Sequence, residues 1–213
     1  MKKLLFLLLI VTLASCLLVG CNPVTPPAEG EGEGTLKLYL TDAPGDYLAV
    51  DILISRIDAH IAEAEQEQTQ EGSLNFQNRD RNNTEEDIGG EWVTLINWDN
   101  GLPVDLIELE GQTMLLSTNE LEAGTYTQLR VFLMGEASIT IEGEEETEEI
   151  TENLIIPSSA QTGIKLTHPF EIIEGQTTEL TLDFDAQKSI FINGNGEYMM
   201  QPTIKVISES SSS

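Results

Sequence analysis

Apolar and polar residues alternate through most of the chain that follows its first 35 residues. Leu36, Leu38 and Leu40, for example, are separated by less apolar side chains. Successive side chains of a β-strand point to opposite sides of the sheet, so this period of two predicts strands with one buried face. Further strands are predicted over 49–61, 91–96, 104–109, 113–117, 125–134, 137–142, 149–156, 164–173, 178–185 and 198–207.

The apolar residues of the predicted strand 49–61 change parity near its middle. They occupy even positions and then odd positions, namely Val50, Ile52 and Ile54 followed by Ile57, Ala59 and Ile61. A β-bulge near Ser55 and Arg56 would cause this change, because one extra residue inverts the alternation. A helix over 49–65 is the competing interpretation, since Ala and Glu accumulate towards the end of this segment.

Many short strands without a convincing helix predict an all-β fold, an antiparallel β-sandwich or barrel. After the N-terminal segment, no stretch has a sustained period of 3.6 residues. Two polar stretches interrupt the alternation, a long loop over 62–90 and a Glu-rich turn over 142–149. Asn193-Gly194-Asn195-Gly196 predicts a hairpin turn, because Asn and Gly adopt positive φ at low cost.

The first 21 residues have the composition of an export signal followed by a lipid attachment site. Lys2 and Lys3 precede an apolar run that is too short and too often interrupted for a membrane-spanning helix. The run ends in Leu18-Val19-Gly20-Cys21, which resembles the lipobox of bacterial lipoproteins, in which the cysteine carries a diacylglycerol. Cys16 ends a second match, but cleavage before it would leave an apolar N-terminus. An ordinary secretory signal or a retained anchor helix is the alternative.

These features divide the chain into four parts. We expect a signal peptide over 1–20, a lipidated cysteine with a tether over 21–34, a β-sandwich domain over 35–207 and a disordered tail over 208–213. Pro, Gly and Glu dominate the tether and Ser dominates the tail, so neither can bury enough apolar surface to fold. The expected location is the cell envelope, on the extracytoplasmic side of a membrane to which the lipid attaches the chain.

Acidic residues outnumber basic residues by 37 to 10, which gives a formal net charge of −27. This balance excludes a nucleic-acid partner bound through its phosphates, which requires a basic surface. It also argues against a polybasic contact with anionic lipid. Both cysteines lie in the N-terminal segment, so the folded part has no thiol for a disulfide or a metal site. We therefore expect no cofactor.

Five short motifs follow one another in the predicted domain. They are Leu40-Thr41-Asp42-Ala43-Pro44, Leu121-Glu122-Ala123-Gly124-Thr125-Tyr126-Thr127-Gln128-Leu129-Arg130, Ile156-Pro157-Ser158-Ser159-Ala160-Gln161-Thr162-Gly163-Ile164-Lys165-Leu166, Leu182-Asp183-Phe184-Asp185-Ala186 with Ser189, and Pro202-Thr203-Ile204-Lys205-Val206. In this order they resemble the bacterial and archaeal lipoprotein domain known as domain of unknown function 4382. The resemblance spans 35–207 and implies a secreted or lipid-anchored β-sandwich of immunoglobulin-like or transthyretin-like kind, with no known activity. The 62–90 loop and the 142–149 turn depart from the pattern of the family.

Four aspartates are weak candidates for a metal site. Asp42 and Asp46 share one turn, in which Asp42 can instead accept hydrogen bonds from its own backbone. Asp183 and Asp185 lie two residues apart on the same predicted face of a strand, where they could bind Ca²⁺ or act as an acid and a base. The structural alternative is charge pairing with a cation on a neighbouring strand, for which Lys165, Arg130 and Lys205 are available.

The remaining polar and aromatic residues give no catalytic motif. The sequence contains neither a serine-nucleophile elbow nor a phosphate-binding glycine loop. His60 and His168 lie in different predicted strands without cysteines, which disfavours zinc, and His60 is expected on the solvated face. Trp92 is expected in the core, and Trp98 is expected to be partly exposed.

The leading hypothesis is a membrane-anchored extracytoplasmic lipoprotein with a non-enzymatic binding or structural β-sandwich, whose protein or glycan partner is unknown. The first alternative is a calcium-stabilised adhesion or carbohydrate-binding module. The second is an extracytoplasmic hydrolase that uses Asp183 and Asp185.

Overall fold

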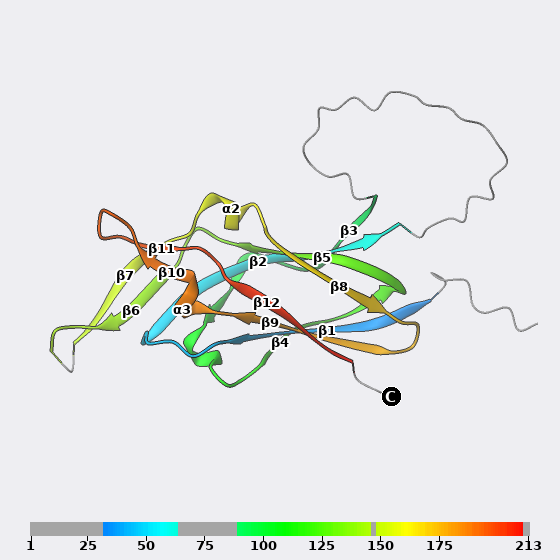
Figure 1. Ribbon diagram of the computed structural model, residues 1–213, viewed down its shortest axis with the longest axis horizontal. Coiled ribbons are helices and arrows are strands. Elements are labelled where there is room, and N and C mark those ends of the chain that lie inside the picture. Colours follow the sequence, from blue (N-terminus) through cyan, green and yellow to red (C-terminus); the bar gives the residue numbers. More distant parts are fainter. Residues whose placement is uncertain (1–31, 64–88, 146–147, 211–213) are drawn as a thin grey trace, which may run out of the picture.

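The computed structural model describes residues 32–63, 89–145 and 148–210, and most of its regular structure is β-strand. The strands form two sheets that pack against each other, as Figure 1 shows. The predicted all-β sandwich is thus confirmed. The predicted signal peptide and Cys21 lie outside the described residues. Within the described ranges, no helix is long and apolar enough to cross a membrane.

The smaller sheet has four strands in the order β12–β9–β1–β4. They are β1 (Glu33–Asp42), β4 (Met114–Glu122), β9 (Thr177–Phe184) and β12 (Ile204–Ser210). The central strands β1 and β9 run parallel, with Leu38 opposite Leu180 and Leu40 opposite Leu182. The edge strands β4 and β12 pair antiparallel with β1 and β9.

The larger sheet has the strand order β10–β11–β7–β6–β2–β5–β8, and β3 also pairs with β2. Its strands are β2 (Ala49–Ala62), β3 (Gly90–Asp105), β5 (Gly124–Leu133), β6 (Ser138–Glu142), β7 (Glu149–Ile155), β8 (Ile164–Ile172), β10 (Ile190–Ile192) and β11 (Tyr198–Met200). Since β7 and β11 run parallel, as β1 and β9 do, the expectation of purely antiparallel sheets is wrong for these two pairs.

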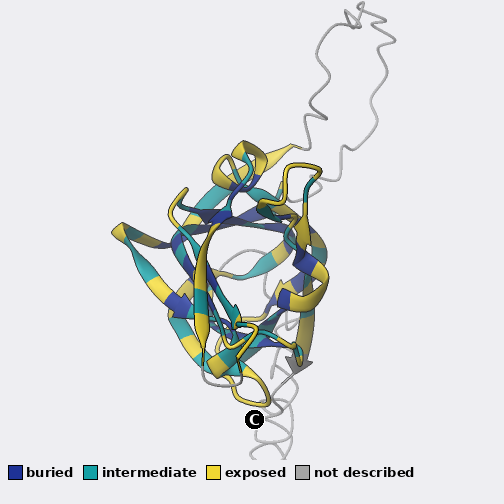
Figure 2. Cartoon of the chain, turned by 90° about the vertical axis from the view of Figure 1, so that its left-hand side faces the viewer, coloured by how far each residue is buried: buried dark blue, intermediate teal, exposed yellow. Residues whose placement is uncertain are grey.

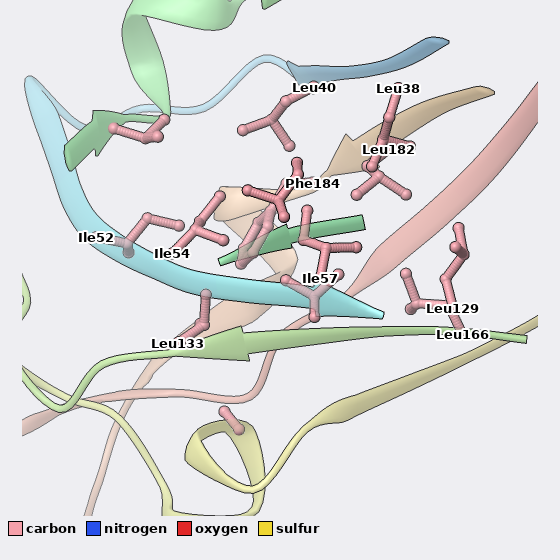
Figure 3. Packing of buried hydrophobic residues seen from close by; sticks show 14 of the residues in the cluster. Leu38, Leu40, Ile52, Ile54, Ile57, Leu129, Leu133, Leu166, Leu182 and Phe184 are labelled. Atoms are coloured by element: carbon pink, nitrogen blue, oxygen red, sulfur yellow. The ribbon is translucent and has the colours of Figure 1, made fainter. Parts of the chain in front are cut away.

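The core lies between the two sheets and is built from alternate positions of the facing strands. Leu38, Leu182 and Phe184 come from the smaller sheet, and Ile57 and Leu129 come from the larger sheet. All five are at most 1% exposed. Figure 3 shows their side chains gathered between the two layers, and in Figure 2 the buried residues belong mostly to the strands, whereas the connecting loops are largely exposed.

The parity change in β2 is a β-bulge, as the sequence predicts, and the helical interpretation of this segment is wrong. The register shifts between Ile54 and Arg56 against both β3 and β5. Ile57 therefore faces the core like Ile54, whereas Arg56, Asp58 and His60 lie on the outer side of the sheet. Without the bulge, these three polar side chains would continue the parity of Ile54 and point into the core.

Several predicted elements differ in extent. β3 is one strand of 16 residues where two shorter strands are expected. The predicted strand 198–207 is divided at Pro202, which has no N–H to pair. Sequence alternation gives no signal for three short helices, η1 (Ile107–Leu109), α2 (Ser158–Gln161) and α3 (Ala186–Ser189), or for β10.

The strands also extend beyond the expected domain limits at 35 and 207. β1 begins at Glu33, which pairs with Glu122, and β12 ends at Ser210, which pairs with Thr178. Backbone hydrogen bonds hold these polar ends in the sheet, so the pattern of apolar residues underestimates the length of the strands.

The predicted connections agree where the structure describes them. The Glu-rich turn links β6 to β7, and residues 146–147 lie outside the described part. Asn193 and Glu197 close the hairpin between β10 and β11, with an N···O distance of 2.9 Å and Gly196 at φ +84°. Most of the predicted 62–90 loop, residues 64–88, also lies outside the described ranges.

The chain crosses from the smaller to the larger sheet between β4 and β5. Here the hydroxyl of Tyr126 donates a hydrogen bond to the carbonyl of Glu122 at 3.2 Å. The ring of Tyr126 stacks on Phe170 with 5.1 Å between centroids. This tyrosine therefore fixes the corner at which the chain changes layer.

Candidate functional site

Asp42 lies at the end of β1 and is 4% exposed. Its Oδ1 accepts a hydrogen bond of 2.9 Å from the backbone N–H of Ala186, and its Oδ2 has no hydrogen-bond partner within the described part of the chain. Burial raises the pKa of Asp42 to about 6, and the neighbouring Asp185 and Asp183 add to the rise, whereas the N–H groups of Ala186 and Ala43 oppose it. Asp42 thus ties β1 to α3, beyond the local turn that the sequence suggests.

Asp185 precedes α3 beside Asp42 and is 3% exposed. Its carboxylate accepts a hydrogen bond from the backbone N–H of Lys188 at 3.0 Å and forms an ion pair with the Lys188 ammonium, which lowers the pKa of Asp185. Ser189 Oγ donates to the Asp185 carbonyl and accepts from the N–H of Thr203. We call this set of residues the Asp42–Asp185 junction; its members are Asp42, Asp185, Ala186, Lys188, Ser189 and Thr203.

The other two candidate aspartates point elsewhere. Asp46 is exposed, and its backbone N–H, rather than its carboxylate, bonds to Gln187 Oε1 at 2.9 Å. Asp183 lies on the outer face of the smaller sheet, directly opposite Lys205 of β12. The expectation that Asp183 and Asp185 share a face is wrong, because β9 ends at Phe184 and the chain turns into α3.

For Asp183 and Asp185 the geometry fits the structural alternative, charge pairing with a cation. Cations stand next to the carboxylates, Lys188 at Asp185 and Lys205 opposite Asp183. Among residues 32–63, 89–145 and 148–210, no three His, Cys, Asp or Glu side chains are arranged to hold a metal ion. The junction closes the fold rather than presenting a free site.

Trp92 differs from its expected place. Trp98 is partly exposed, as expected, and packs against the core, whereas Trp92, expected in the core, lies on the outer side of the larger sheet. His60 lies on that side too, as expected, but it is 3% exposed and its ring is 4.9 Å from the ring of Trp92. His168 lies on β8, with its Nε2 at 2.6 Å from Ser208 Oγ.

The outer side of the larger sheet carries a patch of basic, aromatic and polar side chains. Cross-strand pairing aligns it in three rows, because residues directly opposite each other point to the same side. One row is Thr94–Asp58–Arg130–Lys165 and the next is Trp92–His60–Gln128–Thr167, from β3, β2, β5 and β8 respectively. Arg56 and Phe132 are opposite each other in the adjoining row. We call these ten residues the basic–aromatic face.

The carboxylate of this face is fully engaged. Asp58 is 7% exposed, accepts a hydrogen bond from Thr94 Oγ1 at 3.0 Å and pairs with Arg56 Nε at 3.1 Å. The Arg56 guanidinium also covers the ring of Phe132 at 3.9 Å from the centroid. Although Asp58 is the cross-strand neighbour of Arg130, its charge is balanced by Arg56.

Arg130 and Lys165 are the two cations of the face without such balance. The Arg130 guanidinium lies over the ring of Trp92, 4.1 Å from its centroid, so the side chain crosses β2 above Asp58 and His60. Its buried Nε has no hydrogen-bond partner, and neither Arg130 nor Lys165 forms an ion pair with a described residue. The two residues are directly opposite each other, and Lys165 is exposed.

Sequence alternation predicts only part of this face. It places Arg130 on the side of its strand opposite to Leu129 and Val131, and the bulge signal in β2 places His60 outward. Which strands are neighbours is a property of the folded sheet, so the pairing of Arg130 with Lys165 and its stacking on Trp92 have no local signal. The closest sequence signal is the scarcity of cations in a chain with 37 acidic residues.

Comparison with known proteins places the whole domain in one family. No curated protein matches the chain, and no solved structure matches it. A family model described as "Domain of unknown function (DUF4382)" matches residues 33–202. This range includes the larger sheet with the basic–aromatic face, the smaller sheet except β12, and the junction except Thr203. The protein therefore belongs to the DUF4382 family, the family that its five motifs resemble.

Proposed function

We propose that this protein is a membrane-anchored extracytoplasmic lipoprotein whose β-sandwich is a non-enzymatic binding domain, and that the basic–aromatic face is its binding surface. The anchor is supported by the lipobox ending at Cys21 and by the polar segment that separates it from β1. The binding role is supported by the unbalanced cation pair of the face.

The observation that carries the binding role is the position of Arg130 directly opposite Lys165. Like charges in this arrangement repel, with Cβ atoms about 4.5–5.5 Å apart, and they destabilise the sheet. Arg130 has Asp58 opposite it on β2, but Asp58 is paired with Arg56. On the other neighbouring strand, a carboxylate at position 165 would be the stabilising choice in a chain with net charge −27. A cation pair that costs stability in the free protein is explained if an anionic ligand neutralises it.

Lys165→Glu is expected to raise the free energy of unfolding by about 0.5–1 kcal/mol, because it replaces repulsion with an attractive cross-strand pair. Lys205→Glu is the matched control. It makes the same change in net charge at an exposed strand position, but it places a carboxylate opposite Asp183, so stability should fall by a similar amount. Urea unfolding of the full chain measures both changes.

Equal effects of the two substitutions would contradict the proposal, because they would mean that Arg130 and Lys165 do not repel each other. A destabilising Lys165→Glu would likewise show that Lys165 already has a favourable partner in the free protein. In either case the face would have no unbalanced charge to offer a ligand.

The lipid anchor predicts a separate result. In a bacterial host, Cys21→Ala should abolish the incorporation of radiolabelled palmitate, because it removes the thiol that carries the lipid, whereas Cys16→Ala should retain it. Loss of label only in Cys16→Ala would move the attachment to the second lipobox match. An unlabelled wild-type chain would refute the anchor.

The two alternative functions find less support in the geometry. A hydrolase that uses Asp183 and Asp185 needs both carboxylates at one place, but Asp185 is buried and paired with Lys188. A calcium-stabilised module needs six to eight oxygen ligands. Asp42 and Asp46 do not combine as ligands, because the Asp46 side chain is exposed and Asp42 accepts a hydrogen bond from the N–H of Ala186.

A further inference from the structure

The basic–aromatic face holds the Arg130 guanidinium in the kind of fixed orientation that a carboxylate receptor requires. A guanidinium binds carboxylates through two parallel N–H···O bonds, and a planar ring beneath it fixes the plane from which those bonds leave. Trp92 supplies this ring for Arg130. Because the side chain is held against the ring before a ligand arrives, less side-chain entropy is lost on binding.

Lys165 supplies the second charge of the receptor. It lies on the neighbouring strand directly opposite Arg130 and is exposed. Its ammonium is a flexible point charge, which can follow an anion that the guanidinium has already oriented. Because the Arg130 side chain extends over β2 towards Trp92, away from β8, the two cations can hold two carboxylates of one polymer.

The exposed polar side chains beside the cation pair are neutral hydroxyl groups. Thr94 and Thr167 are exposed at the two sides of the face, whereas Asp58 is buried and paired with Arg56. Hydroxyl groups can donate to and accept from the hydroxyl groups of a sugar chain.

An acidic peptide fits this face less well. Protein partners are usually anchored by large side chains that bury apolar surface in the centre of the interface. The exposed large apolar side chains of the described residues lie off this face; they are Leu48, Leu115, Ile173, Phe191, Ile192 and Ile207. The aromatic rings of the face, Trp92 and Phe132, are themselves covered by Arg130 and Arg56.

We propose that the basic–aromatic face binds a carboxylate-bearing polysaccharide, with Arg130 and Lys165 as the groups that recognise its carboxylates. This inference rests on the binding role proposed above and adds the chemical class of the ligand. The strongly negative charge of the rest of the chain repels polyanions, so the contact is local and depends on these two residues.

The test uses the full chain in non-ionic detergent at about 150 mM salt, where charges more than about 8 Å apart are screened. Three probes are titrated by calorimetry: hexagalacturonate, its methyl ester and hexaglutamate. Hexagalacturonate should bind. The methyl ester, which keeps the sugar and loses the charge, and hexaglutamate, which keeps the charge and loses the sugar, should each bind at least about tenfold more weakly, a difference of about 1.4 kcal/mol.

Lys165→Gln and Arg130→Gln should each weaken hexagalacturonate binding by about tenfold, whereas Lys205→Gln on the other sheet should leave it unchanged. Lys165 is exposed, so its variant tests the site even where Arg130→Gln perturbs the packing over Asp58. Equal binding of the methyl ester would overturn the role of the carboxylate, and equal binding of hexaglutamate would replace the polysaccharide by an acidic peptide.

No binding of any probe by the wild-type chain would overturn the ligand class. The proposed binding surface would still be tested by comparing the stability of Lys165→Glu with that of Lys205→Glu, a measurement that requires no ligand. The failure of this inference is thus distinct from the failure of the proposed function.

Discussion

Phe184→Ala is expected to lower the free energy of unfolding by about 3–5 kcal/mol. Phe184 is 1% exposed at the end of β9, and Figure 3 shows its ring between the layers near Leu40 and Ile54. Its removal loses the transfer free energy of the ring and leaves a cavity that the two sheets fill only in part. The melting temperature of the full chain should fall by about 10 °C in a calorimetric scan.

Phe191→Ala is the matched control for this substitution. Phe191 lies on β10 and is 45% exposed, so its truncation should change stability by no more than about 0.5 kcal/mol. A small effect at Phe184, or equal losses at the two positions, would show that the two sheets do not enclose Phe184 as a packed core.

The alternation of apolar residues predicts the fold class well because each sheet buries one face. Leu36, Leu38 and Leu40 mark β1 without ambiguity, and the parity change in 49–61 locates the bulge between Ile54 and Arg56. The parallel pairing of β1 with β9 has no such signal, because side-chain alternation is the same in parallel and antiparallel strands. β10 is missed for another reason: it has three residues, too few to show a period.

The Asp42–Asp185 junction explains why three of the five family motifs occur where they do. The first motif contributes Asp42, the fourth contributes Asp185, Ala186 and Ser189, and the fifth contributes Thr203. Asp42 and Ala186 are 144 residues apart in the chain, yet a buried hydrogen bond joins them. The motifs therefore indicate how the smaller sheet is closed, and they carry no indication of a reaction.

The basic–aromatic face depends on the β-bulge in β2. The inversion of parity in β2 is what turns Asp58 and His60 outward, where Arg130 and Trp92 cover them. The sequence predicts this inversion. From the sequence alone, however, Arg130 and Lys165 are interpreted only as charge partners for aspartates. Their mutual pairing appears once β5 and β8 are known to be neighbours.

Asp42→Asn is expected to stabilise the protein at neutral and alkaline pH and to leave its stability at pH 4 nearly unchanged. Asn retains the Oδ1 that accepts from the N–H of Ala186 and removes the charge that burial disfavours. The pKa of Asp42 is about 6 in the folded state against an ordinary value of 3.8, so the folded state binds the proton more tightly than the unfolded state.

The sign of the pH dependence follows from this difference. Where the folded state holds more protons, the free energy of unfolding falls as pH rises. The Asp42 contribution is therefore most favourable below about pH 4, declines through about pH 6 and is constant above it, with a full amplitude of about 3 kcal/mol. Asp185 acts in the opposite direction, since Lys188 lowers its pKa, so the wild-type curve is a sum of opposing terms.

The difference between the wild type and Asp42→Asn isolates the Asp42 contribution, because the other charged groups near it, Asp183, Asp185, Lys188 and Lys205, are common to both chains. Urea unfolding at pH 4 and pH 8 should give a difference of about 1–3 kcal/mol in favour of the variant at pH 8 and less than about 0.5 kcal/mol at pH 4. Asp46→Asn removes an exposed carboxylate from the same loop and should change stability by less than about 0.5 kcal/mol at both pH values. If Asp42→Asn is less stable than the wild type at pH 8, the ionised carboxylate of Asp42 is stabilised by its surroundings. The ionised Asp42 would then not lower the stability of the junction at neutral pH, and the prediction would be wrong.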